Sequence, residues 1–192
     1  MNAPVKTPAT IPFDAARLDR WMDEEGIDVL IANSKHNVQY LLGGHRAFFF
    51  DYMDAMGVSR YLPLVIYAKG APDKAAFFGH RLENFQRENN PFWVPVQLCN
   101  SSGSLDTMAK AIDHIKKVGL SSKRIGIELG FMPMDAAQAL RDAFGGEPVV
   151  KFLAGARDGT VVGLQIDDRH LERRHRFRPH DACIVMAGLD DA

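Results

Sequence analysis

Cysteine is scarce in this chain, and its scarcity limits the kinds of site that the chain can form. Cys99 and Cys183 are the only two cysteines among 192 residues, and they belong to no metal-binding or redox spacing. Two isolated thiols are typical of a reducing compartment, where a buried cysteine usually acts as inert packing. The sequence therefore predicts no cysteine-based metal or redox centre.

An excess of charge is also lacking, as is any long apolar run. Twenty-three basic and 24 acidic side chains give a net charge of −1, which creates no field to attract nucleic acid, an anionic membrane or an acidic substrate. The first ten residues lack the apolar core that a signal peptide needs. No stretch approaches the roughly 20 apolar residues of a membrane span. We therefore expect a cytoplasmic protein without a membrane partner.

The motifs of the commonest catalytic and nucleotide sites are missing as well. The sequence contains no G-x-S-x-G, G-x-G-x-x-G or G-x-x-x-x-G-K-[ST] pattern. His170, His175 and His180 recur every five residues, a spacing that would not bring them together on a helix. The serine-rich stretch 101–104 could offer amides to a phosphate, but a loop that ends in a helix-capping serine is the commoner explanation. No catalytic or metal-binding residue is predicted.

A cluster of arginines near the carboxyl terminus raises the possibility of nucleic-acid binding. Residues 157–192 contain six arginines but also seven acidic residues, so the positive charge is local and partly neutralised. The sequence therefore argues against a nucleic-acid partner. The cluster comprises Arg169, Arg173, Arg174, Arg176 and Arg178.

Apolar periodicity predicts an α/β fold. Leu18, Trp21 and Met22 form the stripe of a helix over residues 14–25, with Asp14 as its cap and Gly26 at its end. The apolar segment 27–32 is typical of a strand buried on both faces. Segments 62–68 and 75–78 predict a hairpin closed by the turn at 69–73, and 33–44 is a loop or a short helix.

The second half alternates strands and helices. The expected strands are 92–98, 125–129 and 149–153, and the expected helices are 81–89, 104–118 and 133–144, with Ser104 capping the second helix and Leu105 facing inward. Two strand–helix–strand passages and one hairpin predict a mixed β-sheet flanked by helices.

The segment 45–60 is aromatic without a clear period. It either packs in the core or forms an exposed surface that meets a partner chain or lines a shared pocket, because clustered aromatic and arginine side chains are typical of interface centres. The candidate residues for a partner-facing or pocket-facing surface are His45, Arg46, Phe48, Phe49, Phe50 and Tyr52.

Several motifs follow one another in a characteristic order along the chain. The first is segment 17–31, and the second is segment 37–43 with Asn37, Tyr40 and Gly43. Three further stretches follow: Phe49 to Pro63, Pro91 to Pro95 and Arg124 to Leu129. The order and spacing of these motifs resemble the creatinase/prolidase N-terminal domain, whose motif Asn37, Tyr40 and Gly43 match.

The resemblance implies a fold and a role. The implied fold is a mixed sheet flanked by helices with ribonuclease H-like layering. The implied role is non-catalytic: such a domain supports oligomerisation and shapes the catalytic pocket of an Xaa-Pro peptidase (aminopeptidase P or prolidase) or of creatinase. The expected partner is a second copy, as a homodimer, or a catalytic-domain chain. The family's catalytic domain binds two divalent metals, or none in creatinase, and none of its ligands carries over to this chain.

The resemblance covers residues 13–155, after a flexible lead-in over 1–12 and before an atypical charged tail over 156–192 that we expect to be poorly ordered. Leu42 stands where the family usually has threonine, and the family's Arg, Lys and Glu linker pattern does not follow Leu153. A stand-alone domain, one half of a split Xaa-Pro peptidase or creatinase-like hydrolase, and a truncated or frame-shifted remnant remain as alternatives.

Overall fold

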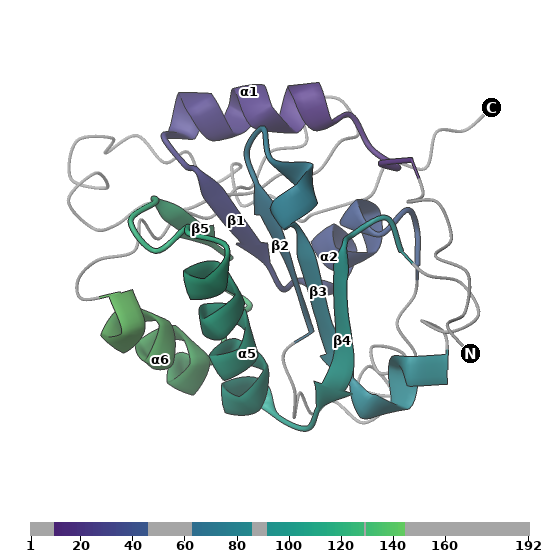
Figure 1. Ribbon diagram of the computed structural model, residues 1–192, viewed down its shortest axis with the longest axis vertical. Coiled ribbons are helices and arrows are strands. Elements are labelled where there is room, and N and C mark those ends of the chain that lie inside the picture. Colours follow the sequence, from purple (N-terminus) through teal and green to yellow (C-terminus); the bar gives the residue numbers. More distant parts are fainter. Residues whose placement is uncertain (1–9, 46–62, 86–91, 129, 145–192) are drawn as a thin grey trace, which may run out of the picture.

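The computed structural model describes residues 10–45, 63–85, 92–128 and 130–144 (Figure 1). Helices and strands alternate along the chain, with short 3₁₀ turns at Pro72–Lys74 and Arg81–Glu83. The longer elements are α1 (Ala15–Glu25), β1 (Val29–Ala32), α2 (Lys35–Leu41), β2 (Leu64–Ala68), β3 (Ala76–His80), β4 (Val96–Ser101), α5 (Ser104–Lys117), β5 (Ile125–Ile127) and α6 (Met134–Phe144).

Within the described residues, the strands form one mixed sheet in the order β4-β3-β2-β1-β5. β2 runs antiparallel to β1 and β3, whereas β1 pairs in parallel with β5 and β3 pairs in parallel with β4. The strands β1, β3, β4 and β5 therefore end at the same edge, where β2 begins. We call this edge the carboxyl edge and the opposite one the amino edge.

Helices cover both faces of the sheet, as Figure 1 shows for α5 and α6 on one face. The side chains of each strand alternate between two apolar clusters because successive residues point to opposite faces. Val29 and Ile31 pack in the cluster that includes α5 and α6, whereas Leu30 and Ala32 pack in the cluster that includes α1 and α2. The predicted α/β class, a mixed sheet flanked by helices, is confirmed.

The predicted cap and the predicted end of the first helix are also confirmed. The Asp14 carboxylate accepts a hydrogen bond of 2.9 Å from the Arg17 N–H, so it caps α1. Gly26 ends the helix with φ of 68°, a left-handed conformation that glycine adopts without steric cost. A Cβ there would also lie 2.7 Å from the Arg124 guanidinium.

Two predicted elements begin differently from what the sequence predicts. The strand expected over 92–98 begins at Val96, because residues before it form a turn whose backbone binds the Gln97 side chain at Phe92 and Val94. The helix expected over 81–89 begins with a 3₁₀ turn at Arg81–Glu83 and continues as α-helix at residues 84–85, and residues 86–91 lie outside the described part. The strand predicted over 149–153 lies outside it as well.

The prediction for the start of α5 is also wrong. Gly103 occupies the cap position, and Ser104 is the first helical residue, with its hydroxyl donating to the Asp135 carboxylate at 2.8 Å. Leu105 is exposed rather than inward, because the buried stripe of α5 begins one turn later at Met108.

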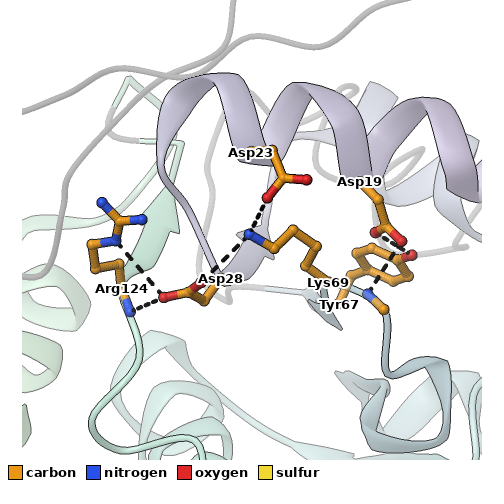
Figure 2. Close-up of polar contacts among 7 residues, drawn as sticks. Asp19, Asp23, Asp28, Tyr67, Lys69 and Arg124 are labelled. Carbon is orange, nitrogen blue, oxygen red and sulfur yellow. Dashed lines mark hydrogen bonds and ion pairs between the residues drawn. The ribbon is translucent and has the colours of Figure 1, made fainter.

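The amino edge carries a network of polar side chains that ties α1 to the sheet (Figure 2). Lys69, just after β2, bonds the Asp23 carboxylate of α1 at 2.6 Å and lies 3.5 Å from that of Asp28. Burial acts to raise the pKa of Asp28, but the Arg124 N–H and the charges of Lys69 and Arg124 outweigh it and hold that pKa below its ordinary value. Beside this group, the Tyr67 hydroxyl donates to Asp19 at 2.8 Å.

Candidate functional site

Buried polar side chains gather at the carboxyl edge of the sheet. Of the buried polar side chains in the described ranges, most lie at the last residue of β1, β3, β4 or β5 or within five residues after it: Asn33, Ser34, Asn37, His80, Glu83, Ser101 and Glu128. In open α/β sheets the region outside the carboxyl ends of the strands is where ligands and partners usually bind. This edge is therefore the candidate functional site.

Glu128 is the centre of the largest polar cluster at this edge. It is 1% exposed and follows β5, yet the described hydrogen-bond partners of its side chain come from the junction of β1 and α2. Its Oε2 accepts the backbone N–H groups of Asn33 at 2.5 Å and Ser34 at 2.7 Å. Its Oε1 accepts the Ser34 hydroxyl at 2.6 Å and the Asn37 side-chain amide at 2.5 Å. Four donors thus fill both oxygens of one buried carboxylate.

The cluster also fixes the loop that follows β5. Asn33 donates its side-chain amide to the Phe131 carbonyl at 2.7 Å, so β1 is linked to this loop by two separate contacts. Ser34 caps α2 by accepting the Asn37 N–H. The side-chain oxygens of Asn33 and Asn37 are buried and have no hydrogen-bond partner among the described residues, so both amides are oriented by what they donate.

The family-motif residues lie on α2 and just beyond it. Asn37 bonds Glu128, as described above. Tyr40 packs against Phe13 with ring centroids 5.8 Å apart, and burial, together with the nearby Asp14 carboxylate, raises its pKa. Gly43 has φ of 71°, and a Cβ there would lie 2.9 Å from the Pro12 ring. Each of the three has a definite structural role.

Of the predicted partner-facing residues, the structure describes only His45. Its ring packs edge-on against Phe92, with centroids 4.6 Å apart, and Phe92 in turn packs on the buried ring of Phe77. The other five residues, from Arg46 to Tyr52, lie outside the described part of the chain, and the surface they would form stays a prediction.

His80 ends β3 at the same edge and should make the fold sensitive to mild acid. Burial lowers the pKa of His80, and the positive charge of Arg81 adds to the effect. A histidine whose pKa is lowered by folding is charged more readily in the unfolded chain. Stability should therefore fall as the pH drops below about 6.5, the ordinary histidine value.

The substitution His80→Asn tests this pH dependence. The asparagine oxygen can replace Nδ1 as acceptor of the Leu82 N–H, a bond of 3.2 Å, without titrating. We expect the melting temperature of the wild type to fall between pH 7 and 5 more steeply than that of the variant. Parallel pH profiles would show that His80 does not carry the effect.

The other sites considered from the sequence gain no support. At the serine-rich stretch, the Ser102 N–H is bonded to the Asp106 carboxylate at 3.0 Å, so a side chain of the chain itself occupies that position. Across the described ranges, no group of three or more His, Cys, Asp and Glu side chains could hold a metal ion. The histidines and arginines of the carboxyl-terminal tail lie beyond Phe144 and are not described.

No helix in the described part of the chain is both long enough and apolar enough to cross a membrane.

Glu128 is the residue that sequence reasoning missed. It was assigned to the interior of a strand over 125–129, whereas β5 ends at Ile127 and Glu128 turns toward α2. The available signal was its position, because an acidic side chain directly after a buried apolar strand requires several hydrogen-bond donors around it.

Comparisons with known proteins agree with this architecture. Residues 15–155 match the creatinase/prolidase N-terminal domain family, and the chain belongs to that family. The N-terminal domain of an Xaa-Pro dipeptidase from Lactobacillus brevis is 15% identical, with a TM-score of 0.50 over 69% of this chain and 88% of that domain. A comparison with curated protein sequences gives no match.

Two further structures resemble the chain more loosely. The creatinase/prolidase N-terminal domain of an X-Pro dipeptidase from Streptococcus pyogenes is 17% identical over 69% of this chain and 94% of that one, with a TM-score of 0.46. The Xaa-Pro dipeptidase from Bacillus anthracis is also 17% identical with a TM-score of 0.46, and the match spans 69% of this chain but only 31% of the dipeptidase.

Proposed function

We propose that this domain is a non-catalytic unit that self-associates through the carboxyl edge of its sheet and shapes a catalytic pocket supplied by another domain or chain. The observation that carries the proposal is the distribution of exposed apolar side chains. Phe131 is 51% exposed and Met134 is 86% exposed, and both follow the carboxyl end of β5.

Other exposed apolar side chains of the described residues lie at the same edge. Leu82 and Phe85 follow β3, and Leu105 follows β4. Exposed apolar surface next to ordered polar groups is typical of a protein interface. The partner that we propose is a second copy of this chain, because self-association requires no other kind of chain.

The segment 46–62 joins α2 to β2, and β2 begins at the carboxyl edge beside Ala32. Its aromatic and arginine side chains, with His45, form the partner-facing or pocket-facing set predicted from the sequence. The chain thus enters β2 at the edge that also carries Phe131 and Met134, which supports the proposed surface.

A test of self-association replaces Phe49 and Tyr52 together with alanine. The expected result is a folded chain, judged by circular dichroism, that has shifted from dimer to monomer by light scattering. Loss of folding would instead assign these rings to the core. A wild-type chain that is monomeric at high concentration would contradict the proposal.

The pocket would be that of an Xaa-Pro peptidase or a related creatinase-like hydrolase, as the family membership suggests. A metal-dependent reaction would draw its two divalent ions from the catalytic unit, because the described residues of this chain offer no group to hold them. No catalytic step is therefore assigned to these residues.

One half of a split peptidase is the second candidate. It is favoured by the match of residues 15–155 to a family described as the creatinase/prolidase N-terminal domain. Xaa-Pro cleavage that appears only when this chain is mixed with a separate catalytic-domain chain would support it.

A further inference from the structure

We propose that His80 and the 3₁₀ turn Arg81–Glu83 form a local pH switch. The neutral ring of His80 holds this turn against the end of β3, and protonation of the ring releases the turn while the sheet stays folded. The switch depends on contacts within the chain, so it acts whether or not the domain has a partner. It would place the acid sensitivity of the domain in one hydrogen bond and one segment.

The hydrogen bond that closes the turn requires a neutral histidine. The Leu82 N–H donates to Nδ1 of His80 at 3.2 Å, so the ring caps the turn as an asparagine side chain caps a helix. A ring nitrogen accepts a hydrogen bond only when it carries no proton, and both nitrogens of a charged histidine are donors. Protonation at Nδ1 therefore removes the bond and sets two N–H groups against each other.

Another buried histidine, His114 of α5, provides the contrast. It packs edge-on against Phe78 of β3, and its Nε2 lies 2.9 Å from the Lys74 carbonyl oxygen. That oxygen can only accept, so the His114 ring must donate, and a charged ring keeps the same N–H. His80 and His114 are 8% and 7% exposed, yet acid breaks only the bond of His80.

The charges near His80 keep its ring neutral at pH 7. Burial lowers the pKa of His80, and the adjacent Arg81 adds to the effect, so the ring gains its proton only below about 6.5. From α5, Lys110 places its Nζ 3.5 Å from the hydroxyl of Ser101, the residue that pairs with His80 across β3 and β4. The Asp106 carboxylate bonds Lys110 at 2.9 Å and is therefore engaged within α5.

The turn can open without disrupting the sheet. The pairing of β3 with β4 shifts register between Gly79 and His80, and His80 with Ser101 is its last pair. Leu82 is already 58% exposed, so opening costs little apolar burial. Glu83 is 1% exposed, and release of the turn would bring its carboxylate into water, which favours the charged form. We therefore expect the turn to open at a lower free energy than the core.

Amide hydrogen exchange of the full chain, followed by NMR, measures the opening of the turn. Each rate is compared with that of an unprotected amide at the same pH. We expect the protection of the Leu82 N–H to fall about tenfold between pH 7 and pH 5, because the open form binds a proton more readily. Low urea concentrations should leave this exchange unchanged. They should speed the exchange of Ile31, in the middle of the sheet, because only global opening exposes much surface.

Two variants separate His80 from His114. His80→Asn keeps an acceptor for the Leu82 N–H, His114→Gln keeps a donor for the Lys74 carbonyl, and neither new side chain titrates. The change in Leu82 protection between pH 7 and pH 5 should shrink to less than about twofold in His80→Asn. It should stay at about tenfold in His114→Gln.

Other results would overturn the switch. If Leu82 is equally protected at pH 7 and pH 5, or if the fall persists in His80→Asn, protonation of His80 does not control the turn. If urea speeds the exchange of Leu82 as much as that of Ile31, the turn opens only when the whole domain unfolds. Should His80→Asn fail to fold, the wild type still decides. Its Leu82 N–H resonance must shift with the same midpoint as the His80 ring, and different midpoints would contradict the switch.

Discussion

Replacing Glu128 with leucine should destabilise the domain by at least about 3 kcal/mol, because several buried donors would lose their acceptor at once. Two of these are the backbone N–H groups of Asn33 and Ser34, which cannot turn toward another partner while α2 keeps its first turn. The free energy of unfolding, from urea denaturation followed by circular dichroism, measures the effect.

Glu128→Gln is the matched comparison for this prediction. It has nearly the same shape, and its amide can meet the Ser34 hydroxyl and the Asn37 oxygen, which is unpartnered in the wild type. We expect a loss of only about 1–2 kcal/mol, because bonds to a neutral oxygen are weaker than bonds to a carboxylate. Equal losses for the two variants would show that the hydrogen bonds of Glu128 do not support the fold.

Adding one methyl group at Gly126 should destabilise the domain by about 1–3 kcal/mol. Gly126 lies in the middle of β5, and a Cβ there would lie 2.8 Å from Cδ1 of Ile27. Ile27 is fully buried in the cluster with α1 and α2, so its side chain has no free space into which to move. The variant Gly126→Ala therefore tests how closely β5 and this layer pack.

Ile27→Val supplies the second arm of a double-mutant cycle. It removes Cδ1, the atom nearest to the added methyl group, and by itself should cost about 0.5–1.5 kcal/mol. The double variant should be more stable than the sum of the single losses predicts. Additive losses would show that the cost at Gly126 has another origin, such as a shift of β5 itself.

The sequence predicted the layers of this fold well, because they depend on periodic apolar residues. The segment 27–32 is apolar apart from Asp28, and both faces of β1 are in fact covered by helices. The N-terminal cap of α1 at Asp14 and the end of α1 at Gly26 were also predictable, since each depends on residues close in sequence.

The features that were missed depend on contacts between distant residues. Nothing local to residues 92–95 shows that Trp93 turns into the core and donates its indole N–H to the Leu41 carbonyl at 2.6 Å, which delays the start of β4. In the same way, Glu128 finds its partners more than 90 residues earlier in the chain. A single sequence indicates that such a side chain needs donors, but it does not tell which residues supply them.

The candidate site was predictable only in part. The family motif selected Asn37, and the structure gives it a partner in Glu128. The aromatic segment was selected by composition alone, which predicts a partner surface without locating it. Of its six candidate residues the structure describes His45 alone, so the partner surface stays a prediction.

Amide hydrogen exchange at low and high protein concentration tests the central claim most directly, because it locates an interface on the unmodified chain. The account predicts slower exchange at high concentration in the backbone around residues 102–106 and 130–135, at the carboxyl edge. It predicts unchanged exchange around 19–28 and 119–124, at the amino edge. Exchange that does not depend on concentration, or protection confined to the amino edge, would contradict the claim that this domain associates through the carboxyl edge of its sheet.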